Sequence, residues 1–173
     1  MDSIPSDFII TNNLIYNSFQ FKCSELIIEK EGSEYGACAF KLNSMFVRFR
    51  VAKITPIKIG QFVTLWKRIE NGPIQPYDIT DEADLFIISV RKDNKFGQFI
   101  FPKSILLGHK IISNKTQSGK LAIRVYPPWD VTVSEQAKKT QIWQLQYFLE
   151  LSNNKSIDYV RANVLYKKIV NDN

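Results

Sequence analysis

The sequence predicts an α/β domain, bordering on α+β, in which a single mixed β-sheet is flanked by helices. Two patterns lead to this class: paired short apolar runs separated by turn residues, and longer segments whose apolar residues recur at helical spacing. A third observation is the length of 173 residues, which fits one domain over residues 1–173 and a core that needs no metal or disulfide.

The first elements are a helix and a hairpin. We expect a helix at 6–21, a segment of either type at 23–30, and hairpin strands at 34–41 and 45–53. In the second strand, alternation directs Val47 and Phe49 to one face of the sheet and Arg48 and Arg50 to the other.

A helix is predicted after the hairpin, from Pro56 to about residue 69. Thr55 can act as its N-cap, and proline suits the first helical position. Its apolar residues recur at helical spacing: Ile59, Phe62, Val63, Trp66 and Ile69. Asn71 and Gly72 can end it, since both tolerate a left-handed backbone.

The second half contains a further hairpin and three helices. We expect an acidic loop at 71–84, strands at 85–90 and 98–101, a short helix at 103–107 ended by Gly108, and a strand at 121–126. A long helix is predicted to begin at Thr132, whose capping box is completed by Glu135, and to run to about Leu151. Residues 157–170 form the last predicted helix.

Composition restricts the class of function. Two cysteines, Cys23 and Cys38, and the single His109 are too few for a disulfide scaffold or a zinc site, so we expect no metal and a reducing, cytoplasmic location. We also expect no signal peptide and no membrane segment, because no apolar run is long enough. His109 is interpreted as a helix-end residue and the cysteines as core residues.

The formal net charge of +6 is unevenly distributed along the chain. Residues 35–69 hold seven basic residues and no acid: Lys41, Arg48, Arg50, Lys53, Lys58, Lys67 and Arg68. Residues 70–84 then hold five acids and no base: Glu70, Asp78, Asp81, Glu82 and Asp84. A basic surface attracts polyanions, which favours nucleic acid, DNA or RNA, as the partner. The acidic run suits a loop that balances this charge better than a cation site.

The candidate nucleic-acid-binding residues are basic or amide side chains at Arg48, Arg50, Lys53, Lys58, Gln61, Arg68, Lys103, Arg124, Lys139 and Gln144. Lys103 is also expected at a helix start. On the long helix, six polar and aromatic residues share one face: Gln136, Lys139, Thr140, Trp143, Gln144 and Tyr147. They suit base contacts, although a core role is the favoured one for Trp143 and the alternative for Tyr147. The stiff turn at 124–130 suits either a binding edge or a plug on the last helices.

The segment from Glu34 to Gln61 resembles the core of the PD-(D/E)-x-K nucleases, in which strand carboxylates hold a divalent metal beside a lysine. The resemblance implies catalytic roles for Glu34 and Lys53, with magnesium as cofactor, if the chain is a nuclease. The position two before the lysine is Val51 rather than an acid, and residues 36–37 are Gly and Ala. A binding protein that does not cleave is therefore favoured on this fold.

Longer strings resemble the MepB-like family of small bacterial cytosolic proteins. They are residues 34–37 (EYGA), 49–63 (FRVAKITPIKIGQFV), 66–68 (WKR), 77–78 (YD), 97–103 (GQFIFPK), 124–129 (RVYPPW) and 136–144 (QAKKTQIWQ). This resemblance implies a restriction-endonuclease-like or tRNA-endonuclease-like core. The leading hypothesis is thus a cytoplasmic nucleic-acid-binding protein. The alternatives are a metal-dependent nuclease and a module that binds a protein or small molecule near Trp129 and Trp143.

Overall fold

The computed structural model describes residues 3–170, with side chains through residue 166. Its largest element is a six-stranded sheet in the order β1-β2-β3-β8-β9-β11. The strands are β1 (Ile27–Ile28), β2 (Cys38–Leu42), β3 (Met45–Val51), β8 (Leu85–Lys92), β9 (Lys95–Pro102) and β11 (Phe148–Glu150). The β3–β8 pair is parallel and the other pairs are antiparallel, so the predicted mixed sheet is confirmed. The expectation of a single sheet is wrong, because a three-stranded and a two-stranded sheet accompany it.

Both predicted hairpins are present in this sheet. The β2–β3 hairpin turns at Asn43, whose φ of 55° is the left-handed conformation that asparagine tolerates. The β8–β9 hairpin turns in the same way at Asp93. The first hairpin begins later than the predicted residue 34, at Cys38. Ser33–Tyr35 instead form a short 3₁₀ helix (η2) between two left-handed glycines, Gly32 and Gly36.

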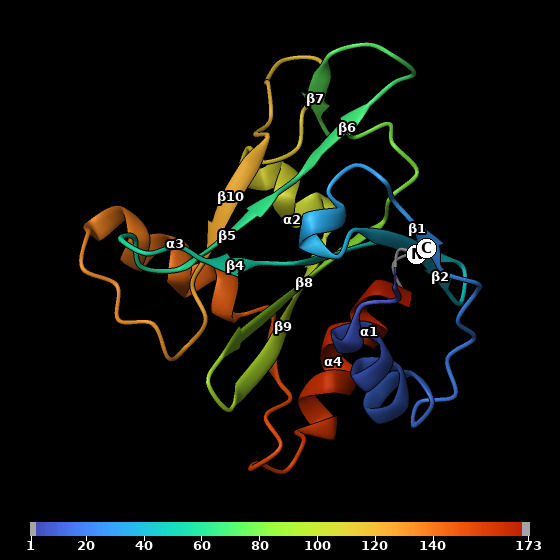
Figure 1. Ribbon diagram of the computed structural model, residues 1–173, viewed down its shortest axis with the longest axis vertical. Helices are drawn as coiled ribbons and strands as arrows, with labels where there is room; N and C mark the ends of the chain where they lie inside the picture. Colours follow the sequence, from blue (N-terminus) through green and yellow to red (C-terminus); the bar gives the residue numbers. More distant parts are fainter. Residues whose placement is uncertain (1–2, 171–173) are drawn as a thin grey trace.

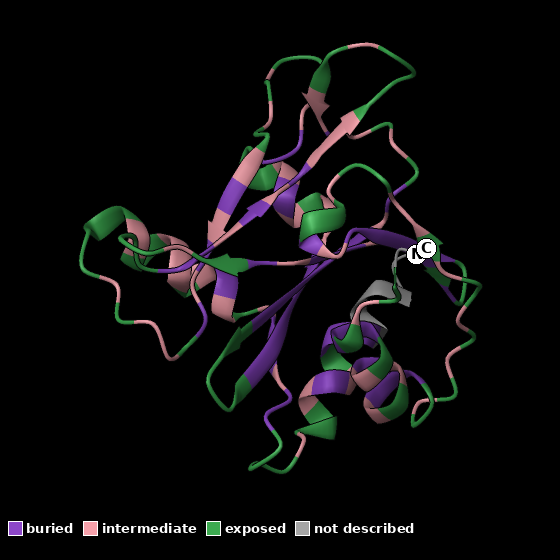
Figure 2. Ribbon diagram, viewed as in Figure 1, coloured by how far each residue is buried: buried purple, intermediate pink, exposed green. Residues whose placement is uncertain are grey.

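Helices cover one face of the sheet. Helix α1 (Ser6–Thr11), the π-helical turn η1 (Asn12–Tyr16) and α4 (Tyr159–Val170) lie side by side there (Figure 1). The ring centroids of Tyr16 in η1 and Tyr166 in α4 are 5.8 Å apart. These helices pack on core residues of β3 such as Val47 and Phe49. The predicted alternation of β3 is thereby confirmed. Figure 2 shows that the central strands β8 and β9 are buried along most of their length.

The other face carries a second layer of short strands and helices. A three-stranded sheet has the order β10-β5-β4, formed by β10 (Ala122–Val125), β5 (Gln61–Thr64) and β4 (Lys53–Ile54). A two-stranded ribbon joins β6 (Trp66–Arg68) to β7 (Ile74–Pro76), and helices α2 (Lys103–Gly108) and α3 (Glu135–Leu145) complete the layer. Val63, Ile123 and Val125 of the small sheet pack on Phe86 and Phe99 of the large one. Within the described range, no helix is long and apolar enough to cross a membrane.

The predicted helix at 56–69 is wrong, because this segment forms a loop followed by β5 and β6. Along β5, buried Gln61 and Val63 alternate with half-buried Phe62 and Thr64, the period of a strand. Gly60, directly before the strand, has a φ of 82° and the Tyr126 ring packed against it. The strand is held by β10, about 60 residues later in the chain, a partner that local spacing cannot indicate.

The predicted helix from Thr132 to Leu151 is also corrected. Ser134, rather than Thr132, caps α3 by accepting a hydrogen bond from the Ala137 amide at 3.1 Å. The helix ends at Leu145, and Phe148–Glu150 form β11 at the edge of the large sheet. Pairing with β9 therefore outweighs the helical spacing of the apolar residues in this segment. The remaining helices at 103–108 and 159–170, and the strand at 122–125, match the expected positions within a few residues.

Candidate nucleic-acid interface

Arg48 and Arg50 of β3 line a cleft between the large sheet and the β6–β7 ribbon. The Glu29 carboxylate accepts hydrogen bonds from both guanidinium groups. Arg50 is only 3% exposed, and it also donates to the Tyr77 hydroxyl at 3.0 Å and to the Phe49 carbonyl at 2.9 Å. A charge removed from water needs such partners, since an unpaired one is costly. Arg50 is thus a structural part of the cleft wall.

Two further cations of this cleft are paired with acids as well. Arg68 Nε lies 2.7 Å from a carboxylate oxygen of Glu31, and Lys67 pairs with Asp81. Five basic and five acidic residues line the cleft, which measures about 480 Å³: Lys30, Arg48, Arg50, Lys67, Arg68, Glu29, Glu31, Glu70, Asp81 and Glu82. We call it the ion-pair cleft. Because its charges cancel, it has little net attraction for a polyanion.

The acidic segment at 70–84 provides acceptors for nearby lysines. Asp81 pairs with Lys67, and its backbone carbonyl accepts from Lys103 Nζ at 2.8 Å. Hydrogen bonds from the backbone and side chain of Thr80 lower the pKa of Asp78. The predicted charge balance is therefore present, and Lys103 is engaged in it.

A different surface, on the three-stranded sheet, carries two cations, of which Lys53 pairs with Glu34 and Arg124 has only neutral hydrogen-bond partners among the described residues. Lys53, Phe62 and Arg124 are register partners on β4, β5 and β10, so their side chains form a row on one face. Lys53 Nζ lies 4.5 Å from the Tyr35 ring centroid, and Arg124 Cζ lies 5.8 Å from that of Phe62. The opposite face of this sheet is buried, so this row faces solvent. We call it the outer face.

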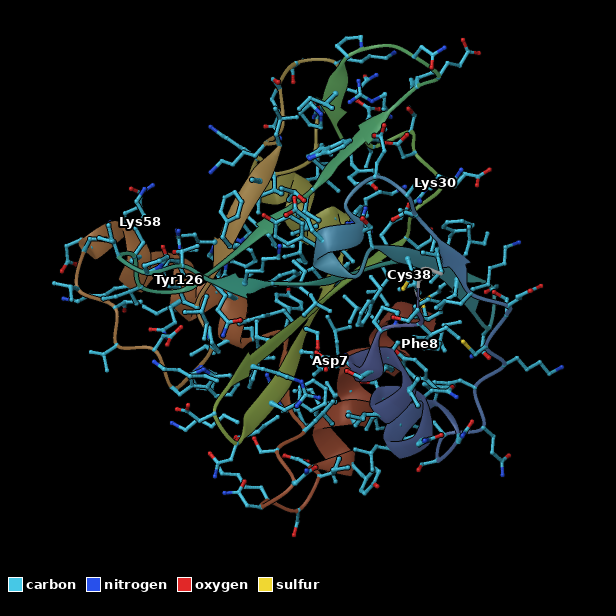
Figure 3. The ribbon with its side chains drawn as sticks, in the orientation of Figure 1. Asp7, Phe8, Lys30, Cys38, Lys58 and Tyr126 are labelled. Atoms are coloured by element: carbon cyan, nitrogen blue, oxygen red, sulfur yellow. The ribbon has the colours of Figure 1, made fainter. Side chains whose placement is uncertain are left out.

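Among the described residues, Arg124 on the outer face has no acidic partner. Its guanidinium donates to Thr55 Oγ1 at 2.8 Å and to the Gly60 carbonyl at 3.2 Å, both neutral acceptors. These contacts hold the loop at 55–60 against β10. The same loop exposes Lys58, and Figure 3 shows Lys58 and Tyr126 on one side of the molecule, opposite Lys30 of the ion-pair cleft.

A groove of about 370 Å³ continues from the outer face between β10 and α3. We call it the α3–β10 groove, and Lys120, Arg124, His109, Tyr126 and Trp143 are among its lining residues. None of the described residues that line it is acidic. Lys139 is exposed on α3, on the same helix face as the lining residues Gln136 and Trp143. The acid at the start of this helix, Glu135, pairs with Lys138 at 2.9 Å. The groove therefore combines surplus positive charge with aromatic rings.

His109 and Trp143 form a stacked pair in this groove. Their ring centroids are 3.9 Å apart and the planes differ by 11°. Trp143 packs in turn on Phe101 at 5.3 Å, so the indole is both a core residue and a groove residue. His109 is exposed at the end of α2, as predicted for a helix-end histidine, and partial burial lowers its pKa.

Besides Arg50, two predicted binding residues lie in the interior. Gln61 is 1% exposed, and its Nε2 donates to the Arg91 carbonyl at 2.9 Å. Gln144 is equally buried; its amide accepts from Tyr126 N at 2.8 Å and donates to the Arg124 carbonyl at 2.9 Å. Gln144 thereby completes the hydrogen bonding of the β10 edge. Both amides stabilise the sheets that carry the cations and do not reach the surface.

The turn at 124–130 packs against α3 and β11. Gln141 Nε2 donates to the carbonyls of Pro127 and Asp130 at 3.0 and 2.9 Å. The Trp129 ring lies 5.7 Å from that of Phe148, edge to face. Residues 127–130 therefore act as the plug, whereas Arg124 and Tyr126 line the α3–β10 groove.

Glu34 and Lys53, the pair considered for nuclease chemistry, lie 3.0 Å apart and are both exposed. Divalent-metal phosphoryl chemistry requires several oxygen ligands around one point. Among the described residues, no group of three His, Cys, Asp or Glu side chains is arranged to hold a metal ion. Glu29 and Glu31, the nearby carboxylates upstream, are engaged by arginines. The donor set for a magnesium site therefore does not fit.

Sequence reasoning missed the partner of Arg50 and two groove residues. Glu29 comes from an irregular segment before β2, and no spacing rule connects it to β3. Lys120 lies within residues 91–124, which hold eight basic residues and one acid, and this excess of positive charge was a usable signal. The stacking of His109 on Trp143 joins residues 34 positions apart and has no local sequence signal.

Comparisons with known proteins give one family. The MepB-like family model matches residues 29–150, which include both hairpins, the outer face and α3. The crystal structure of MepB is 34% identical in sequence and superposes with a TM-score of 0.74, covering 88% of this chain and 99% of that chain. None of the curated proteins compared with the chain matches it.

Proposed function

The chain belongs to the MepB-like family, and we propose that it binds nucleic acid through the outer face and the α3–β10 groove, without cleaving it. The observation that carries this proposal is the location of the uncompensated charge. The ion-pair cleft is neutral in sum, whereas the groove has Lys120 and Arg124 and no acidic lining residue.

Physical chemistry favours a phosphate backbone as the ligand of this surface. Lys58, Lys120 and Lys139 are exposed, and Arg124 bonds only to neutral acceptors. Such cations attract a polyanion and displace its counterions on binding, which makes the affinity depend on salt. Aromatic rings beside them add contacts for bases, as in other proteins that bind single strands.

Binding without cleavage is supported by the Glu34–Lys53 pair. The pair is exposed. The other carboxylates nearby, Glu29 and Glu31, form ion pairs with arginines instead. A metal-dependent nuclease that uses Glu34 and Lys53 is the alternative, but among the described residues no further carboxylates join this pair in a metal site. Incubation of nucleic acid with the protein and Mg²⁺ separates the two, because only a nuclease yields cutting that is lost in Lys53→Ala.

We further propose that the six-stranded sheet is a variant of the restriction-endonuclease-like core. Support comes from the β2–β3 hairpin followed by the parallel strand β8, with helices on one face. The helix expected after Lys53 is replaced by β5 and β6, which distinguishes this variant. A cytoplasmic location is proposed because both cysteines, Cys23 and Cys38, are free thiols.

A binding titration with matched variants tests the proposed function. Fluorescence anisotropy of labelled single- and double-stranded oligonucleotides is measured for the wild type, for Lys58→Ala/Lys120→Ala, and for the control Lys22→Ala/Lys41→Ala. The control lysines are exposed near β1 and β2, and both variants lose the same charge. We expect each lost phosphate contact to reduce the salt slope of log K by about 0.7 for a single strand, so the first variant loses about 1.4.

The outcomes are distinct. Weakened binding in the first variant and unchanged binding in the control support the proposed surface. Equal losses in both variants indicate nonspecific attraction to the net charge, and no salt-sensitive binding at micromolar protein rejects nucleic-acid binding. Recovery of a stable protein partner in the last case favours the interaction-module hypothesis.

A further inference from the structure

We propose that His109, backed by Trp143, is a stacking platform for an unpaired nucleobase, which makes the α3–β10 groove select single-stranded over duplex nucleic acid. This inference rests on the proposed function and names the ligand chemistry of its groove. The starting observation is the parallel stack of the two rings, 3.9 Å apart with an 11° angle between planes.

The arrangement leaves one imidazole face available. Trp143 covers the other face, and the indole is held in place by Phe101 at 5.3 Å. His109 is exposed and lines the groove, so the face turned away from Trp143 is open to solvent. A flat ring fixed from behind is preorganised, because little side-chain freedom remains to be lost on binding.

The surroundings suit a nucleotide better than an isolated aromatic ligand. Lys120 and Arg124 line the same groove and supply charge for the phosphates on either side of a stacked base. The groove has amide and hydroxyl side chains as well, at Gln136 and Thr140, which can contact base edges. Its volume of about 370 Å³ lies in the range of small-ligand sites.

Stacking on His109 requires a base with a free face. In a duplex, both faces of each base are covered by neighbours, and exposing one requires unstacking. An unpaired base needs no such step, and stacking on an aromatic side chain is tolerant of sequence. Single strands of DNA or RNA therefore share the recognised chemistry, and a duplex retains only the phosphate contacts.

Abasic oligonucleotides test this inference separately from phosphate binding. Affinities are measured for oligothymidine and for a strand of equal length with abasic sugars, and likewise for oligouridine and its abasic counterpart. Each pair carries the same phosphates, so only base contacts differ. We expect the base-bearing strand to bind about tenfold more tightly, within the range of stacking on one aromatic residue.

Two variants locate the effect at His109. His109→Ala is expected to remove the tenfold difference in both pairs, and His109→Phe, which keeps an aromatic ring, is expected to retain it. Thermal unfolding of each variant checks that the fold is intact. Salt-sensitive binding with equal affinity for base-bearing and abasic strands overturns the stacking site and leaves the proposed function standing. A difference that persists in His109→Ala also overturns it, and no binding of any strand rejects both.

Discussion

Replacing Glu29 with glutamine is the substitution that most directly tests whether the ion-pair cleft is structural. Glu29 is the carboxylate that both Arg48 and Arg50 contact, and its side chain is 17% exposed. Arg50 is 3% exposed and donates to the Tyr77 hydroxyl. In Glu29→Gln, the Arg50 charge stays in place without a counter-charge, because its position on β3 is fixed by the sheet.

The expected cost follows from this geometry. Removing one partner of a buried ion pair lowers the free energy of unfolding by about 3–5 kcal/mol. Arg50 keeps two neutral acceptors, Tyr77 and Phe49, and the carboxylate is partly exposed, so the lower end of about 3 kcal/mol applies. For a chain of this length, such a loss lowers the melting temperature by about 6–12 °C.

Urea denaturation followed by circular dichroism measures this change. The matched control is Glu34→Gln, which removes the exposed pair with Lys53 and should cost about 1 kcal/mol or less. Equal stabilities of Glu29→Gln and Glu34→Gln would refute the reasoning, because Arg50 would then tolerate burial without its counter-charge.

Three further predictions concern the elements that support the proposed interface. Gln144→Ala leaves Tyr126 N and the Arg124 carbonyl without partners, so unfolding in urea should reveal a loss of about 2–4 kcal/mol; an unchanged midpoint contradicts the role of Gln144. Burial raises the pKa of Cys38 to about 12, so its thiol should stay unreactive with a disulfide reagent at pH 8 until the protein unfolds; rapid labelling of the native protein contradicts this. Gly60→Ala places a Cβ 2.7 Å from the Tyr126 ring at a φ of 82°, and should lower the unfolding free energy by more than about 1 kcal/mol; full stability in the same assay contradicts a strained site.

The elements that the sequence predicts well are those fixed by local chemistry. The β2–β3 and β8–β9 hairpins have asparagine and aspartate where the chain must turn with positive φ, and alternation places Arg48 and Arg50 on one face. The short helix α2 follows Pro102 directly. These signals lie within a few residues of the element they specify.

The elements that the sequence misplaces depend on distant partners. Residues 61–64 have apolar positions that fit a helix, but β10 supplies hydrogen bonds that make them a strand. Residues 148–150 likewise lie within a predicted helix, but they pair with β9 and form the strand β11. Tertiary pairing overrides local spacing in both places.

The candidate interface shows the same limit. The sequence shows an excess of basic residues, but their charge balance depends on Glu29 and Glu31, which no spacing rule connects to Arg50 and Arg68. The sequence therefore predicts a basic protein, whereas only the fold separates the ion-pair cleft from the outer face. Lys53 and Arg124, far apart in the chain, become neighbours through β5.

The most direct test of the central claim is an amide chemical-shift map by NMR, in which ¹⁵N-labelled protein is titrated with a short single-stranded oligonucleotide. We expect the largest shifts in the loop at 55–60, in β10 and along the groove side of α3, with little change at Glu29, Arg50 and Tyr77 in the ion-pair cleft. Shifts centred on the ion-pair cleft, or none at all, would contradict the proposed interface.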